Sequence, residues 1–170
     1  APILLPVTST LFADRAECFA SLAGQHSLGD WLNFLADLSR AQHEVLQGLP
    51  SLQLPDAKTL EQARTHAMPP LNASSLPRPA AWRLALQQLV QRLQATAPES
   101  GQAALTALLA ASESELEALA DMLLKGEPDM ARAAELPFVA AALQIVFTQL
   151  ASQLEASHLH KLDAPGVCPC

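Results

Sequence analysis

The amino-acid sequence predicts an all-α fold, a bundle of about seven helices. Half of the 170 residues are hydrophobic, and alanine and leucine, which both favour helix, supply most of them. Apolar side chains recur at helical spacing between short segments that contain proline or glycine. No stretch of useful length alternates apolar and polar residues as a half-buried strand does, and no internal repeat is present.

The first three helices are expected from their apolar spacing and from residues that are typical of helix ends. In the first helix, Phe12, Ala16 and Phe19 recur on one face. Gly24 is a suitable C-terminal stop for that helix, and Asp56 is a preferred N-cap for the third. The predicted helices run from Ser9 or Thr10 to Gly24, from Ser27 to Gly48, and from Asp56 to about His66.

The other four helices follow a proline-rich segment, residues 68–79, which cannot be helical over its length. Pro98 ends the fourth helix, and Ser112 with Glu115 forms a capping box that opens the sixth. The seventh helix is the most apolar, and we expect it to be the central helix of the bundle. The predicted helices cover residues 80–97, 99–111, 112–126 and 136–156.

Charge and hydropathy exclude several classes of partner. A formal net charge of −7 argues against nucleic acid, because binding to phosphates requires a basic surface. The most apolar stretch, residues 136–150, is interrupted by Gln144, Thr148 and Gln149, whereas a membrane span needs about 20 apolar residues.

The first residues carry no basic region like that of a signal peptide, and three cysteines without a dense framework fit a reducing compartment. We therefore expect a cytoplasmic protein that does not insert into membranes.

The last three residues, Cys168, Pro169 and Cys170, suggest part of a metal site. Two thiols in an i, i+2 pair chelate poorly, and structural zinc sites use four ligands. His158 and His160 lie close upstream, so a site formed by these histidines and the two cysteines is conceivable. The competing interpretation is that both histidines are solvated linker residues, and the lack of an ordered framework favours it.

No catalytic constellation is found. The sequence lacks a Ser-His-Asp arrangement, a glycine-rich phosphate loop and a pair of catalytic carboxylates, so we predict that the protein is not an enzyme. Cys18 is expected to be a buried, inert thiol. The segment from Leu28 to Leu32, with Asp30 and Trp31 beside a glycine, is a candidate docking point. An acidic cluster at the start of the sixth helix is expected to complement the helix dipole on a solvated face; its members are Glu113, Glu115, Glu117 and Asp121.

A series of short segments, taken in order, resembles the formate dehydrogenase accessory protein family, FdhE. The resemblance covers essentially the whole chain, and it rests on the ordered set rather than on one motif. The segments are Leu11-Phe12-x-x-Arg15-Ala16, Leu22-Ala23, Leu28-Gly29-Asp30-Trp31-Leu32, Ala41-Gln42, Met68-Pro69-Pro70-Leu71, Leu76-Pro77 leading to Trp82, Pro137-Phe138 with Ala141-Ala142-Leu143-Gln144, and Cys168-Pro169.

The resemblance implies a helical N-terminal domain followed by two rubredoxin-like or zinc-ribbon knuckles built from Cys-x-x-Cys pairs. Residues 1–156 would be the helical partner-binding domain, and residues 157–170 a linker with the truncated start of the first knuckle. Cys168 matches the first cysteine of that knuckle, whereas Cys170 falls on the variable position between two ligands. We therefore expect no cofactor in these residues. Cys168 would bind iron or zinc only together with residues beyond this chain.

The resemblance further implies a cytoplasmic maturation factor that binds the catalytic subunit of respiratory formate dehydrogenase before twin-arginine export. The candidate contacts are Asp30, Trp31 and the loop of Met68, Pro69, Pro70 and Leu71, although this loop could equally be a structural clamp. The alternatives are an iron-binding redox protein that acts through its cysteine knuckles, another helical chaperone of twin-arginine signal peptides, and a plain helical scaffold. Formation of a homodimer stays open.

Overall fold

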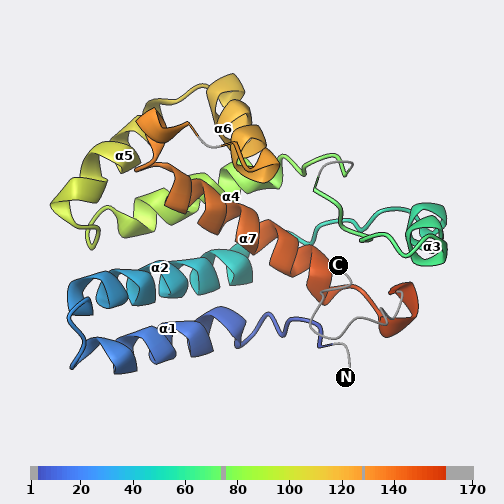
Figure 1. The fold of residues 1–170 in the computed structure, drawn as a ribbon, viewed down its shortest axis with the longest axis horizontal. Helices are drawn as coiled ribbons and strands as arrows, with labels where there is room; N and C mark the ends of the chain where they lie inside the picture. The colour runs from blue at the N-terminus through green and yellow to red at the C-terminus, as the bar shows by residue number, and fades with distance from the viewer. Residues whose placement is uncertain (1–3, 74–75, 128, 160–170) are drawn as a thin grey trace.

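The computed structural model describes residues 4–73, 76–127 and 129–159. Within these ranges the chain forms α-helices, two short 3₁₀ turns and no strand, so the all-α prediction is confirmed (Figure 1). The helices are α1 (Leu11–Ala23), α2 (Gly29–Gly48), α3 (Ala57–Thr65), α4 (Ala81–Leu93), α5 (Glu99–Ala110), α6 (Glu113–Lys125) and α7 (Leu136–Ser152), and the 3₁₀ turns are η1 (Met130–Arg132) and η2 (Ala156–His158).

Helices α1 and α2 form an antiparallel hairpin that occupies one side of the molecule (Figure 1). A tight turn joins them, in which the Gly29 amide donates to the carbonyl of His26 at 2.9 Å. A Cβ atom at Gly29 would lie 2.8 Å from the carbonyl oxygen of Ala23, a distance that real Cβ atoms do not adopt. Glycine at this position therefore lets the start of α2 approach the end of α1.

Helix α7 is the centre of the bundle, as predicted. It crosses the middle of the molecule between α2 and α4 and also packs against α6 (Figure 1). Its buried side chains cover more than half of the helix surface, and Pro137 and Gln144 lie on the exposed remainder. The buried side chains are Phe138, Val139, Ala141, Ala142, Leu143, Ile145, Val146 and Leu150.

The predicted helix-end signals are confirmed for α3 and α6. Oδ1 of Asp56 accepts from the amide of Thr59 at 2.7 Å, which satisfies a donor at the start of α3. At the start of α6, Ser112 and Glu115 form the reciprocal capping box. Gly126 ends α6 in the left-handed region, with a φ of 72°.

The segment between α2 and α3 is held against α7 by one side chain, that of Gln149. Its Oε1 accepts from the amide of Leu52 at 3.1 Å, and its Nε2 donates to the carbonyl of Leu49 at 3.4 Å. Helix α3 and the proline-rich loop that follows it lie at the end of the molecule opposite the α1–α2 turn (Figure 1). Leu60 of α3 and Leu71 of the loop join the hydrophobic core.

The prediction for Cys18 is wrong, and the prediction for the acidic cluster is confirmed for Glu113 and Glu115 only, which are exposed in the first turn of α6. Cys18 is exposed rather than buried, because Phe12, Ala16 and Ala23 define the inner face of α1 and position 18 lies away from it. The acidic cluster is not simply solvated, because Glu117 and Asp121 pair with Arg78 from the segment before α4.

None of the helices in the described ranges is both long enough and apolar enough to cross a membrane.

Candidate partner-binding site

Asp30 and Trp31 lie in the first turn of α2, and both are exposed. The Trp31 side chain is 49% exposed although it is large and apolar. Its ring lies 5.4 Å from that of Phe34, and Phe34 meets Phe138 of α7 edge-on at 6.0 Å. The exposed indole therefore rests on a row of aromatic rings that reaches the core, so its position is well defined.

The proline-rich loop divides into an exposed part and a buried part. Met68 and Pro69 are exposed, whereas Pro70 and Leu71 are buried. The amide of Met68 donates to the carbonyl of Ala63 at 2.8 Å, which fixes the loop against the end of α3. Pro70 and Leu71 are thus packed inside, as residues of a structural clamp would be, and of the four only Met68 and Pro69 present exposed side chains to a partner.

The structure does not bring these two groups of predicted residues together. The α1–α2 turn carries Asp30 and Trp31 at one end of the long axis, and the loop beside α3 carries Met68 and Pro69 at the other (Figure 1). A partner that contacts both groups must extend along the molecule.

A groove lies between α1, α2 and α7, and we refer to it as the α1–α2–α7 groove. Its apolar wall on α2 continues the face of Trp31, because residues spaced by three or four positions share one side of a helix. The lining residues are Arg15 and Phe19 from α1, Leu35, Leu38, Ser39 and Gln42 from α2, and Pro137, Ala140, Ala141 and Gln144 from α7.

Three polar side chains from distant parts of the sequence meet in the α1–α2–α7 groove. Oε1 of Gln144 accepts from Nη1 of Arg15 and from Nε2 of Gln42, each at 3.2 Å. Nε2 of Gln42 also donates to the carbonyl of Ala141 at 3.0 Å, and Gln42 itself is buried. These contacts fix the Gln144 amide with its oxygen directed to the two donors.

Arg15 differs from the other arginines in the described part of the chain, because it alone forms no ion pair. Its guanidinium lies 5.0 Å from the centre of the Phe12 ring, which holds the cation in place. Each of the other arginines has a carboxylate partner: Arg40, Arg64, Arg78, Arg83, Arg92 and Arg132. The α1–α2–α7 groove therefore contains an uncompensated positive charge in an otherwise acidic chain.

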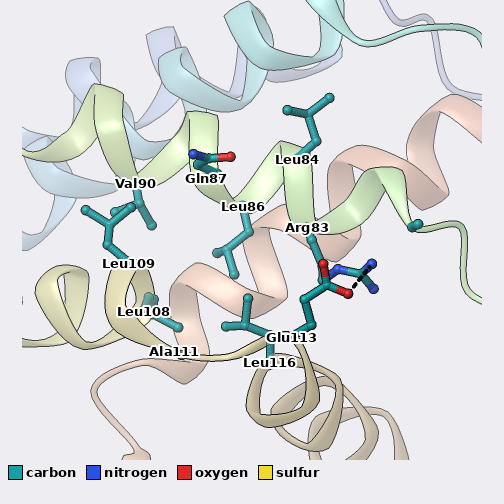
Figure 2. Close-up of a pocket in the computed structure, with 11 residues that line it drawn as sticks. Arg83, Leu84, Leu86, Gln87, Val90, Leu108, Leu109, Ala111, Glu113 and Leu116 are labelled. Atoms are coloured by element: carbon teal, nitrogen blue, oxygen red, sulfur yellow. Dashed lines mark ion pairs between the residues drawn. The ribbon is translucent and has the colours of Figure 1, made fainter.

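A second hollow, between α4, α5 and the start of α6, differs in its electrostatics. Figure 2 shows Arg83 and Glu113 facing each other as an ion pair, with their closest atoms 3.0 Å apart. Arg83 also pairs with Glu117, so its charge is already neutralised. The remaining wall is mainly leucine, and Leu84 and Leu109 are exposed large apolar side chains. Nothing in this hollow selects a charged ligand.

The carboxylate of Glu117 organises the contacts between α4 and α6. Partial burial opposes ionisation of Glu117, but hydrogen bonds from Trp82, Arg83 and Arg78 outweigh this effect, so its pKa is lowered. A hydrogen bond from Arg78 likewise lowers the pKa of Asp121. The cluster has an evident structural role, because its charges satisfy one another.

The predicted metal residues are mostly outside the described ranges. His160, Cys168 and Cys170 lie there, so the structure says nothing about a site that includes them. In the described ranges no group of three or more His, Cys, Asp or Glu residues could hold a metal ion. Nδ1 of His158 accepts from the amide of Glu155 at 3.1 Å, which stabilises the η2 turn.

The model of the FdhE N-terminal family matches residues 1–164 of this chain. The chain belongs to the FdhE family. A curated FdhE homologue from Serratia proteamaculans is 39% identical over 150 residues, which cover 88% of this chain and 48% of that protein. A homologue from Pseudomonas aeruginosa is 36% identical over 168 residues, covering 99% of this chain and 54% of that protein.

A crystal structure of an FdhE family member confirms the helical fold. The FdhE protein from Pseudomonas aeruginosa superposes with a TM-score of 0.85 at 35% sequence identity, over 99% of this chain and 59% of that chain. The resemblance seen in the sequence, to a family of formate dehydrogenase accessory proteins, is therefore confirmed. This FdhE chain spans about half the length of the curated relatives that it matches.

Proposed function

We propose that this FdhE chain is the non-catalytic, partner-binding part of a maturation factor for respiratory formate dehydrogenase. It binds the catalytic subunit in the cytoplasm and supports activation of that subunit before twin-arginine export. The observation that carries this proposal is membership of the FdhE family over residues 1–164. The exposed apolar side chains described above give it physical support, because a partner that buries them gains hydrophobic free energy.

In this proposal the partner contacts Asp30 and Trp31 at one end of the molecule and Met68 and Pro69 at the other. Pro70 and Leu71 contribute indirectly, because their burial holds the loop in place. Retention of an immature subunit and its release after maturation require that the chain bind one form more tightly than the other. The whole protein would hold iron or zinc through Cys168 and residues beyond this chain.

A capture experiment tests the proposal. The tagged chain is immobilised and incubated with the catalytic subunit of respiratory formate dehydrogenase and, in parallel, with an unrelated substrate of twin-arginine export. We expect enrichment of the catalytic subunit only. Equal recovery of the two proteins would rule out a dedicated maturation role for this helical part.

Two alternative functions are separated by further measurements. A chaperone of twin-arginine signal peptides would bind an isolated signal peptide of a molybdoenzyme in a titration, whereas the proposed factor would not. An iron-binding redox protein would show a redox-active iron spectrum when the chain is extended past Cys170. Inert zinc in the same protein would indicate a structural knuckle.

A further inference from the structure

We infer that the α1–α2–α7 groove docks an apolar segment of the partner protein and that Arg15 binds a carboxylate carried by this segment. The inference rests on the proposed function, because it names the surface and the chemistry through which the catalytic subunit is held.

The first argument comes from the hydrogen bonds that Arg15 and Gln144 leave unused. A guanidinium has five N–H donors, and in the described structure Arg15 donates only to Gln144. The Gln144 oxygen already receives two donors, so what Gln144 still offers is its NH₂ group. Both side chains therefore present donors to a ligand, and the ligand must supply acceptors.

The second argument comes from charge. The chain has a formal net charge of −7, yet the cation in the α1–α2–α7 groove has no carboxylate partner among the described residues. A carboxylate is planar and accepts two parallel hydrogen bonds from a guanidinium, so it neutralises Arg15 and satisfies its donors together. A neutral amide or hydroxyl would leave the charge uncompensated.

The third argument comes from the walls of the groove, which identify a protein segment rather than a free anion. Phe19, Leu35 and Ala140 line it, so an occupant buries apolar surface beside the charged contact. Leu22 lies two turns beyond Arg15 on the same side of α1, about 10 Å along the helix axis. Because α1 and α2 are antiparallel, Leu22 and the exposed Trp31 both lie near the turn.

These features define the occupant. It is a segment with an acidic side chain at one end and an apolar anchor about 10 Å away, which on a helix corresponds to about two turns. The acidic side chain pairs with Arg15, and the apolar anchor covers Leu22 and Trp31. Binding in this direction places charge against charge and apolar surface against apolar surface.

The test uses the full chain in the capture assay with the formate dehydrogenase catalytic subunit. Arg15→Glu reverses the charge in the groove, and we expect the dissociation constant to rise about tenfold or more. Lys58→Glu is the matched control, because Lys58 is an exposed cation on α3 that forms no ion pair in the described structure. It changes the net charge equally and should leave binding unchanged. Circular dichroism establishes that both variants keep the helical fold.

A second pair of variants keeps Arg15 in place. Ala140 lies one turn before Gln144, so Ala140→Glu supplies a carboxylate from within the chain that competes with that of the partner. Ala140→Gln has the same bulk without the charge. We expect Ala140→Glu to weaken capture more than Ala140→Gln does.

The outcomes are distinct. If the wild-type chain captures no catalytic subunit, the proposed function is wrong and the inference fails with it. If the wild type captures the subunit and Arg15→Glu captures it equally well, only the groove assignment is wrong. If Arg15→Glu instead abolishes self-association in analytical ultracentrifugation and leaves capture unchanged, the occupant is a second copy of this chain, and our assignment of the occupant is overturned.

Discussion

The indole nitrogen of Trp82 donates a hydrogen bond to the carboxylate of Glu117, with Nε1 and Oε1 2.9 Å apart. Trp82 is fully buried in α4, and Glu117 is partly buried in α6. The same carboxylate accepts from Arg78 at 2.8 Å and from Arg83 at 2.5 Å. A single side chain thus joins α6 to α4 and to the segment that precedes α4.

Removal of the Glu117 carboxylate should destabilise the bundle. In Glu117→Ala, the buried indole N–H loses its acceptor and Arg78, whose side chain is only 14% exposed, loses a partner. We expect a loss of about 2 kcal/mol in the free energy of unfolding, measured by urea denaturation. Glu113→Ala is the control, because the Glu113 side chain is 80% exposed and its loss should cost below about 0.5 kcal/mol. Equal losses in the two variants would contradict this role of Glu117.

The same cluster predicts how stability depends on pH. The pKa of Glu117 is lowered from its ordinary value of 4.5, and the pKa of Asp121 is lowered from 3.8. Because the unfolded chain binds protons more readily than the folded one, this contribution is complete above the ordinary values and is lost as the pH falls through the lowered values. We expect the urea midpoint to decrease below about pH 4.5. Glu117→Gln should flatten this decrease, and an unchanged slope would exclude the cluster as its source.

Substitution at Gly29 tests the tight turn between α1 and α2. In Gly29→Ala the new Cβ would meet the backbone oxygen of Ala23, so we expect a loss of about 1–3 kcal/mol as the helices shift apart. Gly48→Ala is a matched control at the other end of α2, where a Cβ meets nothing within 4 Å. This variant should be neutral or up to about 1 kcal/mol more stable. Thermal unfolding of both proteins provides the comparison.

The exposed indole of Trp31 should matter for binding more than for folding. Trp31→Ala removes a large apolar contact, and we expect the affinity for the catalytic subunit to fall about tenfold or more. The melting temperature should change by only a few degrees, because about half of the side chain is already exposed. Met130→Ala, at another exposed apolar side chain, is the control. A large loss of stability in Trp31→Ala without a change in capture would assign this residue to the core.

Local physics explains why the helices could be predicted from the sequence. Helix ends depend on residues close in sequence, so the N-cap at Asp56 and the left-handed stop at Gly126 follow from short motifs. The apolar spacing likewise identified α7 as the central helix. The error at Cys18 came from reading an apolar neighbour as evidence of burial, whereas helical periodicity places that thiol away from the inner face.

The α1–α2–α7 groove could not be predicted in the same way, because it depends on tertiary contacts. Arg15 and Gln144 are 129 residues apart, and Gln42 and Gln144 are 102 residues apart. No local rule indicates that Arg15 and Gln42 share the Gln144 oxygen as an acceptor. One signal was present: Gln42 falls at helical spacing from Leu38, Val45 and Leu46 on the apolar face of its helix, and a buried amide requires a partner.

The central position of α7 has a consequence for synthesis. Helices α2, α4 and α6 are all synthesised before α7. Their inner faces therefore leave the ribosome before the helix against which they finally pack. We expect a nascent chain that ends at residue 135 to be cleaved rapidly by proteases, and one that includes α7 to resist them. Chaperones that bind exposed apolar segments would therefore act on the nascent helical part until α7 emerges and packs against these faces.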